Sequence, residues 1–336
     1  MNNWCPFITN IKLSLASPPA FRYMHRTILY LSLILIQLPF HWAELILFNK
    51  KIRQRQLVKA PIFILGHWRS GTTTIQRFLC AHNNLSFLNQ YHAFLPLGSS
   101  IHQYLFKPVI SQIFKIFKLK HPSHSVPMSV EFPSEEDIAF CMGGFQETPM
   151  WGHIYSKNAL SFFNKYLILK HGSEARTQFL TKYNYFIKRL SYFHHGNQLI
   201  LKSPANTSRF PEILLLQPNA KFIYIHRNPV EVYFSTMKLL NNNKAQWLQS
   251  MSTKEMNRLF KYGYQKTLER YEQSKQLIPK GNLLELELED LKSKPEKIQQ
   301  KIYEHLNWSI SSGEKTNTAS FLKGHQNASK YLHTVP

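Results

Sequence analysis

The sequence predicts an α/β protein in which a parallel sheet of the P-loop type is flanked by helices, with an apolar helical extension at the N-terminus. Two observations lead to this prediction. Residues 61–74 (PIFILGHWRSGTTT) combine a short apolar strand, a glycine-bounded loop and a helix start. Further short apolar segments alternate with helical ones, which is typical of a parallel sheet covered on both faces. The 336 residues suit one such domain.

The N-terminal segment, residues 1–55, is apolar and basic, and we expect the α/β domain to occupy residues 56–336. The apolar run 28–48 is interrupted by four polar or helix-breaking residues: Gln37, Pro39, His41 and Glu44. Because a spanning helix needs about 20 apolar residues, we expect a pair of buried or membrane-surface helices in a cytoplasmic protein attached peripherally to a membrane. A single signal-anchor is the alternative, and no small-residue cleavage site is evident.

The loop after the first strand, 62–65, has the glycine spacing of a phosphate-binding loop. Gly66 and Gly71 keep the G-x-x-x-x-G pattern, but Thr72-Thr73 stands where a triphosphatase loop has Lys-Ser/Thr. The cation of this loop, Arg69, precedes the second glycine. Backbone N–H groups and a helix N-terminus can still bind phosphate. Since the lysine that reaches a γ-phosphate is absent, we expect a phosphorylated nucleotide other than a triphosphate.

The other elements follow from the periodicity of apolar residues. A helix is expected at 72–81, and the irregular stretch 85–150 contains one helix candidate at 104–119. We expect this stretch to form a binding pocket, because loops on a rigid scaffold carry function. Further on, the pattern predicts helical structure over 160–193, a strand at 198–203, a helix at 209–216, a strand at 221–226, helices at 229–240 and 253–276, and a strand at 283–288.

A second candidate anion site lies at 225–235 (IHRNPVEVYFS). Arg227 ends a predicted strand, Pro229 starts the next helix, and Ser235 follows about two turns later. In parallel sheets ligands bind beyond the carboxyl ends of strands, where an arginine can bind phosphate through two parallel N–H donors. Alone, the motif would fit a helix start with a surface arginine. Its occurrence together with the phosphate loop favours an anion site.

The charge balance excludes some classes of partner. The chain has 41 Lys and Arg against 19 Asp and Glu, a net charge of +22, which attracts polyanions of several kinds. It contains no zinc-finger pattern, RNP-type motif or long basic block, so we do not expect nucleic acid as a partner. The three cysteines are too few and too scattered for a disulfide framework or a Cys₄ metal site. No other pattern predicts a metal.

The two motifs together resemble those of a known superfamily. R-S-G-T-T at 69–73 and R-N-P-x-x-x-x-x-S at 227–235 look like the cofactor motifs of the sulfotransferases that use 3′-phosphoadenosine 5′-phosphosulfate (PAPS). The similarity to one bacterial branch covers roughly residues 40–330 and implies a sulfotransferase-like catalytic domain. The segments that carry it are GHWR at 66–69, PSEEDIAF at 133–140, LKSP at 201–204 and LELEDL at 286–291.

The resemblance implies residues for both ends of PAPS. The 5′-phosphosulfate would bind Arg69, Ser70, Gly71, Thr72 and Thr73, and the 3′-phosphate would bind Arg227 and Ser235. The cytosolic small-molecule sulfotransferases usually carry a lysine at the position of Arg69. Because a guanidinium stays charged at neutral pH, Arg69 is expected to act electrostatically and not as a proton donor. Lys202, at the end of a buried strand, is the second candidate cation for the leaving phosphate oxygen.

Sulfuryl transfer also needs a general base for the acceptor. The acidic triplet 135–137 supplies the first choice, Glu136, and the second, Glu135, while His92 is the third. The triplet would also fit an acidic helix start, and His92 would also fit a surface or core histidine. Four residues lie outside this set: Glu287, Glu289 and Asp290, which we expect to be structural, and His325, which the resemblance places near the nucleotide.

The leading hypothesis is a PAPS-dependent sulfotransferase that needs no metal. The expected acceptor is a hydroxyl or amino group of a carbohydrate or a lipid-linked glycan, with a membrane surface as a further partner. One alternative is a P-loop nucleotide kinase or phosphotransferase. Another is a non-enzymatic protein that binds polyanions or membranes and keeps a degenerate loop. The sequence predicts no oligomeric state.

Overall fold

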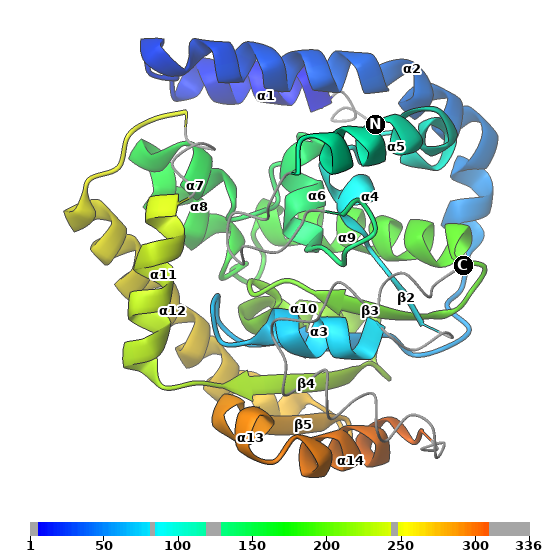
Figure 1. Ribbon diagram of the computed structural model, residues 1–336, viewed down its shortest axis with the longest axis vertical. Helices are drawn as coiled ribbons and strands as arrows, with labels where there is room; N and C mark the ends of the chain where they lie inside the picture. Colours follow the sequence, from blue (N-terminus) through cyan, green and yellow to red (C-terminus); the bar gives the residue numbers. More distant parts are fainter. Residues whose placement is uncertain (1–5, 81–84, 119–128, 243–247, 309–336) are drawn as a thin grey trace.

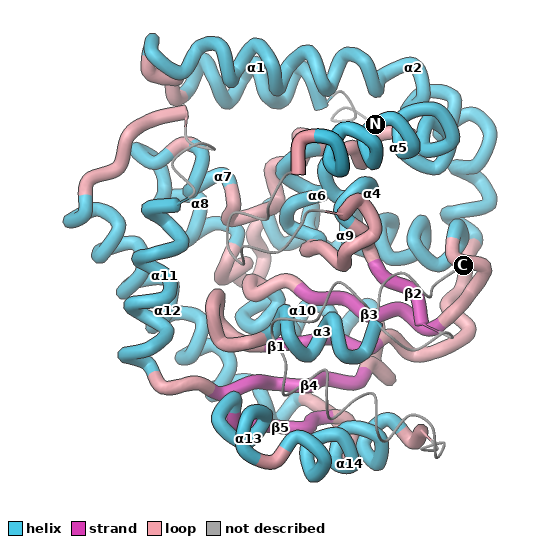
Figure 2. Tube along the Cα trace, viewed as in Figure 1, coloured by secondary structure: helices cyan, strands magenta, loops and turns pink. Residues whose placement is uncertain are grey.

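The computed structural model describes residues 6–80, 85–118, 129–242 and 248–308 (Figure 1). Its centre is a sheet of five parallel strands in the order β2-β3-β1-β4-β5. Figure 2 shows the strands as one central layer with helices around it. The predicted fold class is therefore confirmed. The strands are β1 (Ile62–Leu65), β2 (Leu85–Phe87), β3 (Gln198–Lys202), β4 (Lys221–His226) and β5 (Leu283–Glu287).

The described residues form the following α-helices: α1 (Pro6–Ala16), α2 (Met24–Gln54), α3 (Thr72–Cys80), α4 (Gln90–Phe94), α5 (Ser99–Ile116), α6 (Glu136–Met142), α7 (Trp151–Ile154), α8 (Ala159–Tyr166), α9 (Glu174–Phe193), α10 (Asn206–Leu216), α11 (Pro229–Asn242), α12 (Thr253–Ser274), α13 (Leu288–Ser293) and α14 (Pro295–Leu306).

The strands separate two hydrophobic cores, because successive side chains of a strand point to opposite faces. Phe63 and Phe222, with ring centroids 5.6 Å apart, belong to the core that α9 and α10 cover. Ile62 and Ile223 belong to the core that α3 and α14 cover. The arrangement brings the carboxyl ends of β1, β3 and β4 side by side, where the loops that carry the candidate site begin.

The predicted helical stretch 160–193 is two helices, α8 and α9. Between them Leu169 and Gly172 adopt positive φ angles of 45° and 73°. The side chain of Ser173 then caps α9 by accepting a hydrogen bond from the backbone N–H of Arg176. The linking stretch 170–174 (KHGSE) has no apolar residue, and Gly172 followed by Ser173 is a local signal for a new helix start that the prediction did not use.

The N-terminal segment, residues 1–55, holds two helices, α1 and the much longer α2, and the whole apolar run 28–48 lies in α2. This helix continues through Pro39. Figure 1 shows α2 beside α1 at one end of the molecule before it turns along α5 and α9, and it contacts all three. The stretch Phe21–Gln54 contains an 18-residue window with a mean hydropathy of 1.7, of which 22% is buried. By length and composition alone, this helix could cross a membrane.

Candidate active site

The loop between β1 and α3 has a backbone that requires glycine at two positions. Gly66 and Gly71 have φ angles of 143° and 96°. A Cβ atom on Gly66 would lie 2.5 Å from the hydroxyl of Ser70, and one on Gly71 would collide with Leu288. The loop is compact, since the backbone N–H of Ser70 donates to the carbonyl of His67 at 3.1 Å. The two glycines of the phosphate motif therefore set the shape of the loop.

Thr207, in the first turn of α10, holds the start of this loop. Its Oγ1 accepts a hydrogen bond from the N–H of Gly66 at 2.7 Å and lies 3.1 Å from the carbonyl oxygen of Gly66, to which it donates. Thr207 is fully buried. Sequence reasoning missed this residue. The only available indication was its place in a polar helix start, NTSR at 206–209, directly after a buried strand.

Three hydroxyl residues of the loop lie at or near the start of α3. Ser70 is 2% exposed and Thr72 is 3% exposed. The buried Ser70 hydroxyl has no hydrogen-bond partner within the described part of the chain. Thr73 Oγ1 accepts from Lys202 Nζ at 3.4 Å. A buried hydroxyl without a partner, inside a glycine-shaped loop at a helix N-terminus, fits an anionic ligand.

Arg69 connects the phosphate loop with the second motif. Its Nε donates to the hydroxyl of Ser235 at 2.9 Å, and its carbonyl oxygen accepts from Nη1 of Arg227 at 2.5 Å. Its φ angle of 71° is unusual for a residue other than glycine. Burial and the neighbouring Arg227 lower the pKa of Arg69, while Glu135 acts in the opposite direction. The structure thus gathers two cations and a hydroxyl beyond the ends of β1 and β4.

Arg227 already has a carboxylate partner. Its Nε and Nη2 donate to Oε2 of Glu231, one turn further along α11, at 3.0 and 2.8 Å. Glu231 is 49% exposed, so the pair lies at the surface. A phosphate bound by the guanidinium of Arg227 would share or replace this contact.

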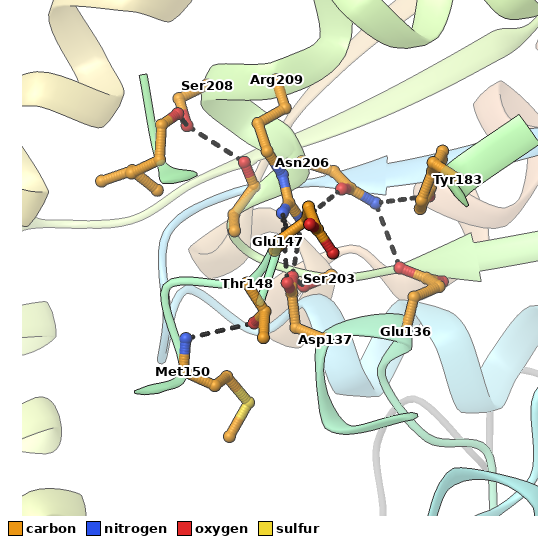
Figure 3. A network of polar contacts seen from close by, with 12 residues as sticks. Glu136, Asp137, Glu147, Thr148, Met150, Tyr183, Ser203, Asn206, Ser208 and Arg209 are labelled. Atoms are coloured by element: carbon orange, nitrogen blue, oxygen red, sulfur yellow. Dashed lines mark hydrogen bonds and ion pairs between the residues drawn. The ribbon is translucent and has the colours of Figure 1, made fainter. Parts of the chain in front are cut away.

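Asp137 lies in a buried polar network at the junction of β3 and α10 (Figure 3). Its carboxylate accepts from both terminal nitrogens of Arg209, at 2.6 and 3.1 Å, and from the hydroxyl of Ser203. Both members of the Asp137–Arg209 pair are less than 5% exposed. Asp137 is therefore a structural anchor between α6 and α10.

Glu136 belongs to the same network. Oε1 accepts from the backbone N–H of Lys202 at 2.6 Å. Oε2 accepts from the side-chain amide of Asn206 at 3.1 Å, as Figure 3 shows. The residue is 1% exposed. Burial, and next the neighbouring Asp137, raise the pKa of Glu136 to about 8. Both of its oxygens are thus engaged by groups that fix the end of β3 and the start of α10.

Glu135 is the more accessible neighbour. Its side chain is 22% exposed, and its Oε1 accepts from Lys202 Nζ at 2.5 Å. The same ammonium group donates to Thr73 in the phosphate loop. Lys202 itself is only 3% exposed at its side chain. Glu135, Lys202 and the start of α3 therefore form one continuous polar contact beside the loop.

His92 lies in a different environment, on α4. Its Nδ1 is 2.9 Å from the hydroxyl of Ser99, and burial together with Arg189 and His194 lowers its pKa to about 3. Among the described residues, no hydrogen bond joins His92 to the phosphate loop, to Lys202 or to the acidic triplet. The structure does not bring this third candidate together with the others.

The remaining acids behave as expected at a helix start. Glu287 occupies the N-cap position of α13, and Glu289 and Asp290 stand in its first turn. His325 lies outside the described residues. No group of three or more His, Cys, Asp or Glu side chains in the described ranges could hold a metal ion.

The fold and the site define a class of protein. A P-loop-type sheet carries a candidate anion-binding loop, shaped by two glycines, after its first strand. This loop lacks the lysine of a P-loop, and Arg227 and Ser235 from beyond β4 lie next to it. A family model described as "Sulfotransferase family" matches residues 61–312, three quarters of the chain. The chain belongs to the sulfotransferase family, and the protein is an enzyme of that class.

Two curated relatives support the family assignment. Both are called omega-hydroxy-beta-dihydromenaquinone-9 sulfotransferase Stf3, one from Mycobacterium bovis and one from Mycobacterium tuberculosis. Each is 25% identical to this chain over 287 residues, which cover 84% of the chain and 71% of the relative.

Solved structures share the fold. Sulfotransferase STF1 from Mycobacterium tuberculosis has a TM-score of 0.72 at 15% identity, over 98% of this chain and 88% of that one. Sulfotransferase STF9 from Mycobacterium avium has a TM-score of 0.70 at 14% identity, over 90% of this chain and 76% of that one.

Proposed function

We propose that this enzyme transfers the sulfuryl group of PAPS to a hydroxyl group carried by an apolar, lipid-like acceptor. The observation that carries the donor assignment is the contact of Arg69 with Ser235 and Arg227. It joins the two motifs that resemble the cofactor motifs of the superfamily into a single cationic site.

In this proposal the phosphate loop binds the 5′ end of the donor. Backbone N–H groups at the start of α3 and the buried Ser70 hydroxyl would hold its oxygens, with Thr72 and Thr73 beside them. Arg227 and Ser235 would bind the 3′-phosphate, with Arg227 releasing part of its contact with Glu231. These donors suit phosphate and sulfate because they combine fixed positive charge with hydrogen bonds.

The chemistry would be an in-line displacement at sulfur. The acceptor oxygen forms a bond to sulfur while the bond between sulfur and the 5′-phosphate oxygen breaks, and the acceptor proton passes to a carboxylate. Arg69 and Lys202 would neutralise the charge that develops on the leaving oxygen. Of the three candidate bases we now favour Glu135, because Glu136 has both oxygens engaged in the buried network and His92 faces α5 and α9.

Two features favour an apolar alcohol as acceptor. Stf3 is named as acting on a hydroxylated menaquinone. In this chain Trp68, next to Arg69, packs against the rings of Phe163 and His153, with centroids 5.9 and 6.3 Å away. This gives the loop an aromatic wall. A carbohydrate or glycolipid hydroxyl is the second candidate. The expected cytoplasmic location stays a prediction.

Two measurements test this function. Calorimetry should show that adenosine 3′,5′-bisphosphate binds without Mg²⁺ and more tightly than ATP with Mg²⁺. The opposite preference would favour a phosphotransferase, and binding of neither would favour a non-enzymatic role. The second measurement is sulfate transfer from labelled PAPS to a polyprenyl alcohol, a glycolipid and a soluble phenol. Transfer to the polyprenyl alcohol should be fastest, whereas transfer to the glycolipid alone would restore the carbohydrate proposal.

A further inference from the structure

In the apolar stretch 28–48 of α2, polar side chains face inward and many large apolar side chains face outward, although Ile34 is buried. The polar residues that interrupt its apolar sequence, Gln37, His41 and Glu44, are all less than 10% exposed. At 3.6 residues per turn they lie on one side of the helix. Ile28 and Ile46, which precede and follow these residues along α2, are 60% and 81% exposed. An ordinary surface helix of a soluble protein has the reverse pattern.

The inward polar side chains tie α2 firmly to the rest of the domain. Glu44 binds the guanidinium of Arg189 on α9 at 2.5 and 2.8 Å and accepts from the hydroxyl of Ser100. The side-chain amide of Gln37 accepts from the backbone N–H of Leu97 at 3.1 Å. These buried contacts fix the rotation of the helix and keep its apolar side exposed.

Helix α5 extends this apolar side. It lies against α2 through the rings of Phe40 and Phe106, whose centroids are 5.5 Å apart. Leu105, Val109 and Ile116 share one side of α5 and are 61%, 57% and 71% exposed. Exposed apolar surface on this scale marks a contact with a partner or a membrane. We call the exposed apolar sides of α2 and α5 the α2/α5 face.

Positive charge surrounds this face. Residues 1–130 contain 14 Lys and Arg and a single acidic residue, Glu44, which is buried. Both ends of α2 carry exposed cations, with Arg22 just before it and Lys50 and Lys51 in its last turns. Lys115 is exposed near the end of α5. One exposed carboxylate, Glu131, lies beside this rim and pairs with Lys107 of α5 at 2.6 Å. The cations still outnumber it, and a rim with net positive charge complements an anionic lipid surface.

We propose that the α2/α5 face docks on an anionic phospholipid bilayer as an interfacial surface. The apolar side chains enter the headgroup boundary, Trp42 lies at that boundary with 55% of its surface exposed, and the basic rim contacts lipid phosphates. The inference does not depend on the identity of the donor or the acceptor.

The same contacts disfavour two other roles for the helix. A spanning α2 would have to withdraw Gln37 and Glu44 from their buried partners into hydrocarbon, at high cost. A two-fold contact between copies would place the same cationic rim against itself, because such interfaces pair a surface with its own copy.

Sedimentation with vesicles tests the proposal on the full chain. We expect binding to vesicles of phosphatidylcholine mixed with phosphatidylglycerol, weaker binding to phosphatidylcholine alone, and a loss of binding as salt is raised. Ile28→Asp should weaken binding about tenfold or more, because it removes a large apolar contact. Leu215→Asp is the matched control, since Leu215 on α10 is 61% exposed and lies outside the α2/α5 face. It should bind as wild type does.

Several outcomes would overturn the proposal. One is failure of the wild-type protein to bind anionic vesicles, and another is equal binding of these vesicles by Ile28→Asp and wild type. Retention in host membranes after an alkaline carbonate wash would indicate a spanning helix. A dimer that Ile28→Asp dissociates would indicate a contact between copies. Affinity for adenosine 3′,5′-bisphosphate should be unchanged in both variants, which separates docking from the proposed reaction. Ile46→Asp is a second variant in case Ile28→Asp does not fold.

Discussion

Arg69 Nε donates a hydrogen bond to Ser235 Oγ at 2.9 Å, although the two residues are 166 positions apart in the chain. One belongs to the phosphate loop after β1 and the other to α11, beyond β4. Their contact makes a single site out of two motifs, and the predictions below test what that site holds.

Arg227→Ala should weaken binding of adenosine 3′,5′-bisphosphate by about 2–5 kcal/mol, because a charge-assisted contact to the 3′-phosphate is lost. Calorimetry measures the change directly. Arg53→Ala, an exposed arginine at the end of α2, is the control and should bind as wild type does. Equal affinity of Arg227→Ala and wild type would remove Arg227 from the nucleotide site.

Glu135→Gln should lower turnover about 10²–10⁴-fold with unchanged bisphosphate affinity, because the amide cannot take the acceptor proton. Single-turnover transfer from labelled PAPS gives the rate. Glu131→Gln, a nearby carboxylate that is 52% exposed, should keep the wild-type rate. Full activity of Glu135→Gln would return the search for the base to Glu136 and His92.

Above pH 8, where the carboxyl of Glu136 is ionised, Glu136→Gln should instead destabilise the fold by about 1–3 kcal/mol. Glu136 accepts one N–H group at each oxygen, and Asn206 cannot reverse its amide because its carbonyl accepts from Arg209 at 2.8 Å. The new amide must therefore face a donor. Urea unfolding measures the loss, with the exposed Glu289→Gln as control. A variant with wild-type stability and no turnover would support Glu136 as the base.

Thr207→Val keeps the shape of the side chain but removes both hydrogen bonds to Gly66. We expect a loss of about 1–3 kcal/mol in the free energy of unfolding, since the buried N–H of Gly66 is left without its acceptor. Bisphosphate affinity should fall too, because the loop loses its anchor. Thr181→Val, at an exposed position on α9, should change neither quantity. An unchanged affinity would show that the loop keeps its shape without Thr207.

The stability of the protein should fall as the pH drops from 6.5 towards 4. Burial lowers the pKa of His153 from 6.5 to about 4, so in this window the unfolded chain binds a proton that the folded protein does not. His153→Phe preserves the ring contacts with Trp68 and Phe163. It should reduce the change in the free energy of unfolding with pH by up to about 1.4 kcal/mol per pH unit, which is the contribution of one proton. Urea unfolding at several pH values checks this. Identical slopes would mean that His153 does not titrate in the window.

The strands and the anion loop could be predicted because their patterns are local. The strands 62–65 and 221–226 match β1 and β4, and the two glycines stand where the backbone requires them. Helix boundaries were less accurate at the break between α8 and α9, where the prediction did not use Gly172 and Ser173 as the signal for a new helix start. Thr207 was missed because its partner, Gly66, is 141 residues away.

The sequence by itself determined the fold class, the phosphate loop and the pairing of Arg227 with Ser235 as a candidate anion motif. Only the tertiary structure decided which acid of the triplet is accessible and which side of α2 faces outward. Glu135 is the N-cap residue of α6 and has an extended backbone, whereas Glu136 is the first helical residue, so the two side chains leave the chain in different directions. Their packing against β3 and α10 buries Glu136 and leaves Glu135 beside Lys202. In α2 the ion pair of Glu44 with Arg189 likewise decides that the apolar side remains exposed, because a buried carboxylate needs its partner.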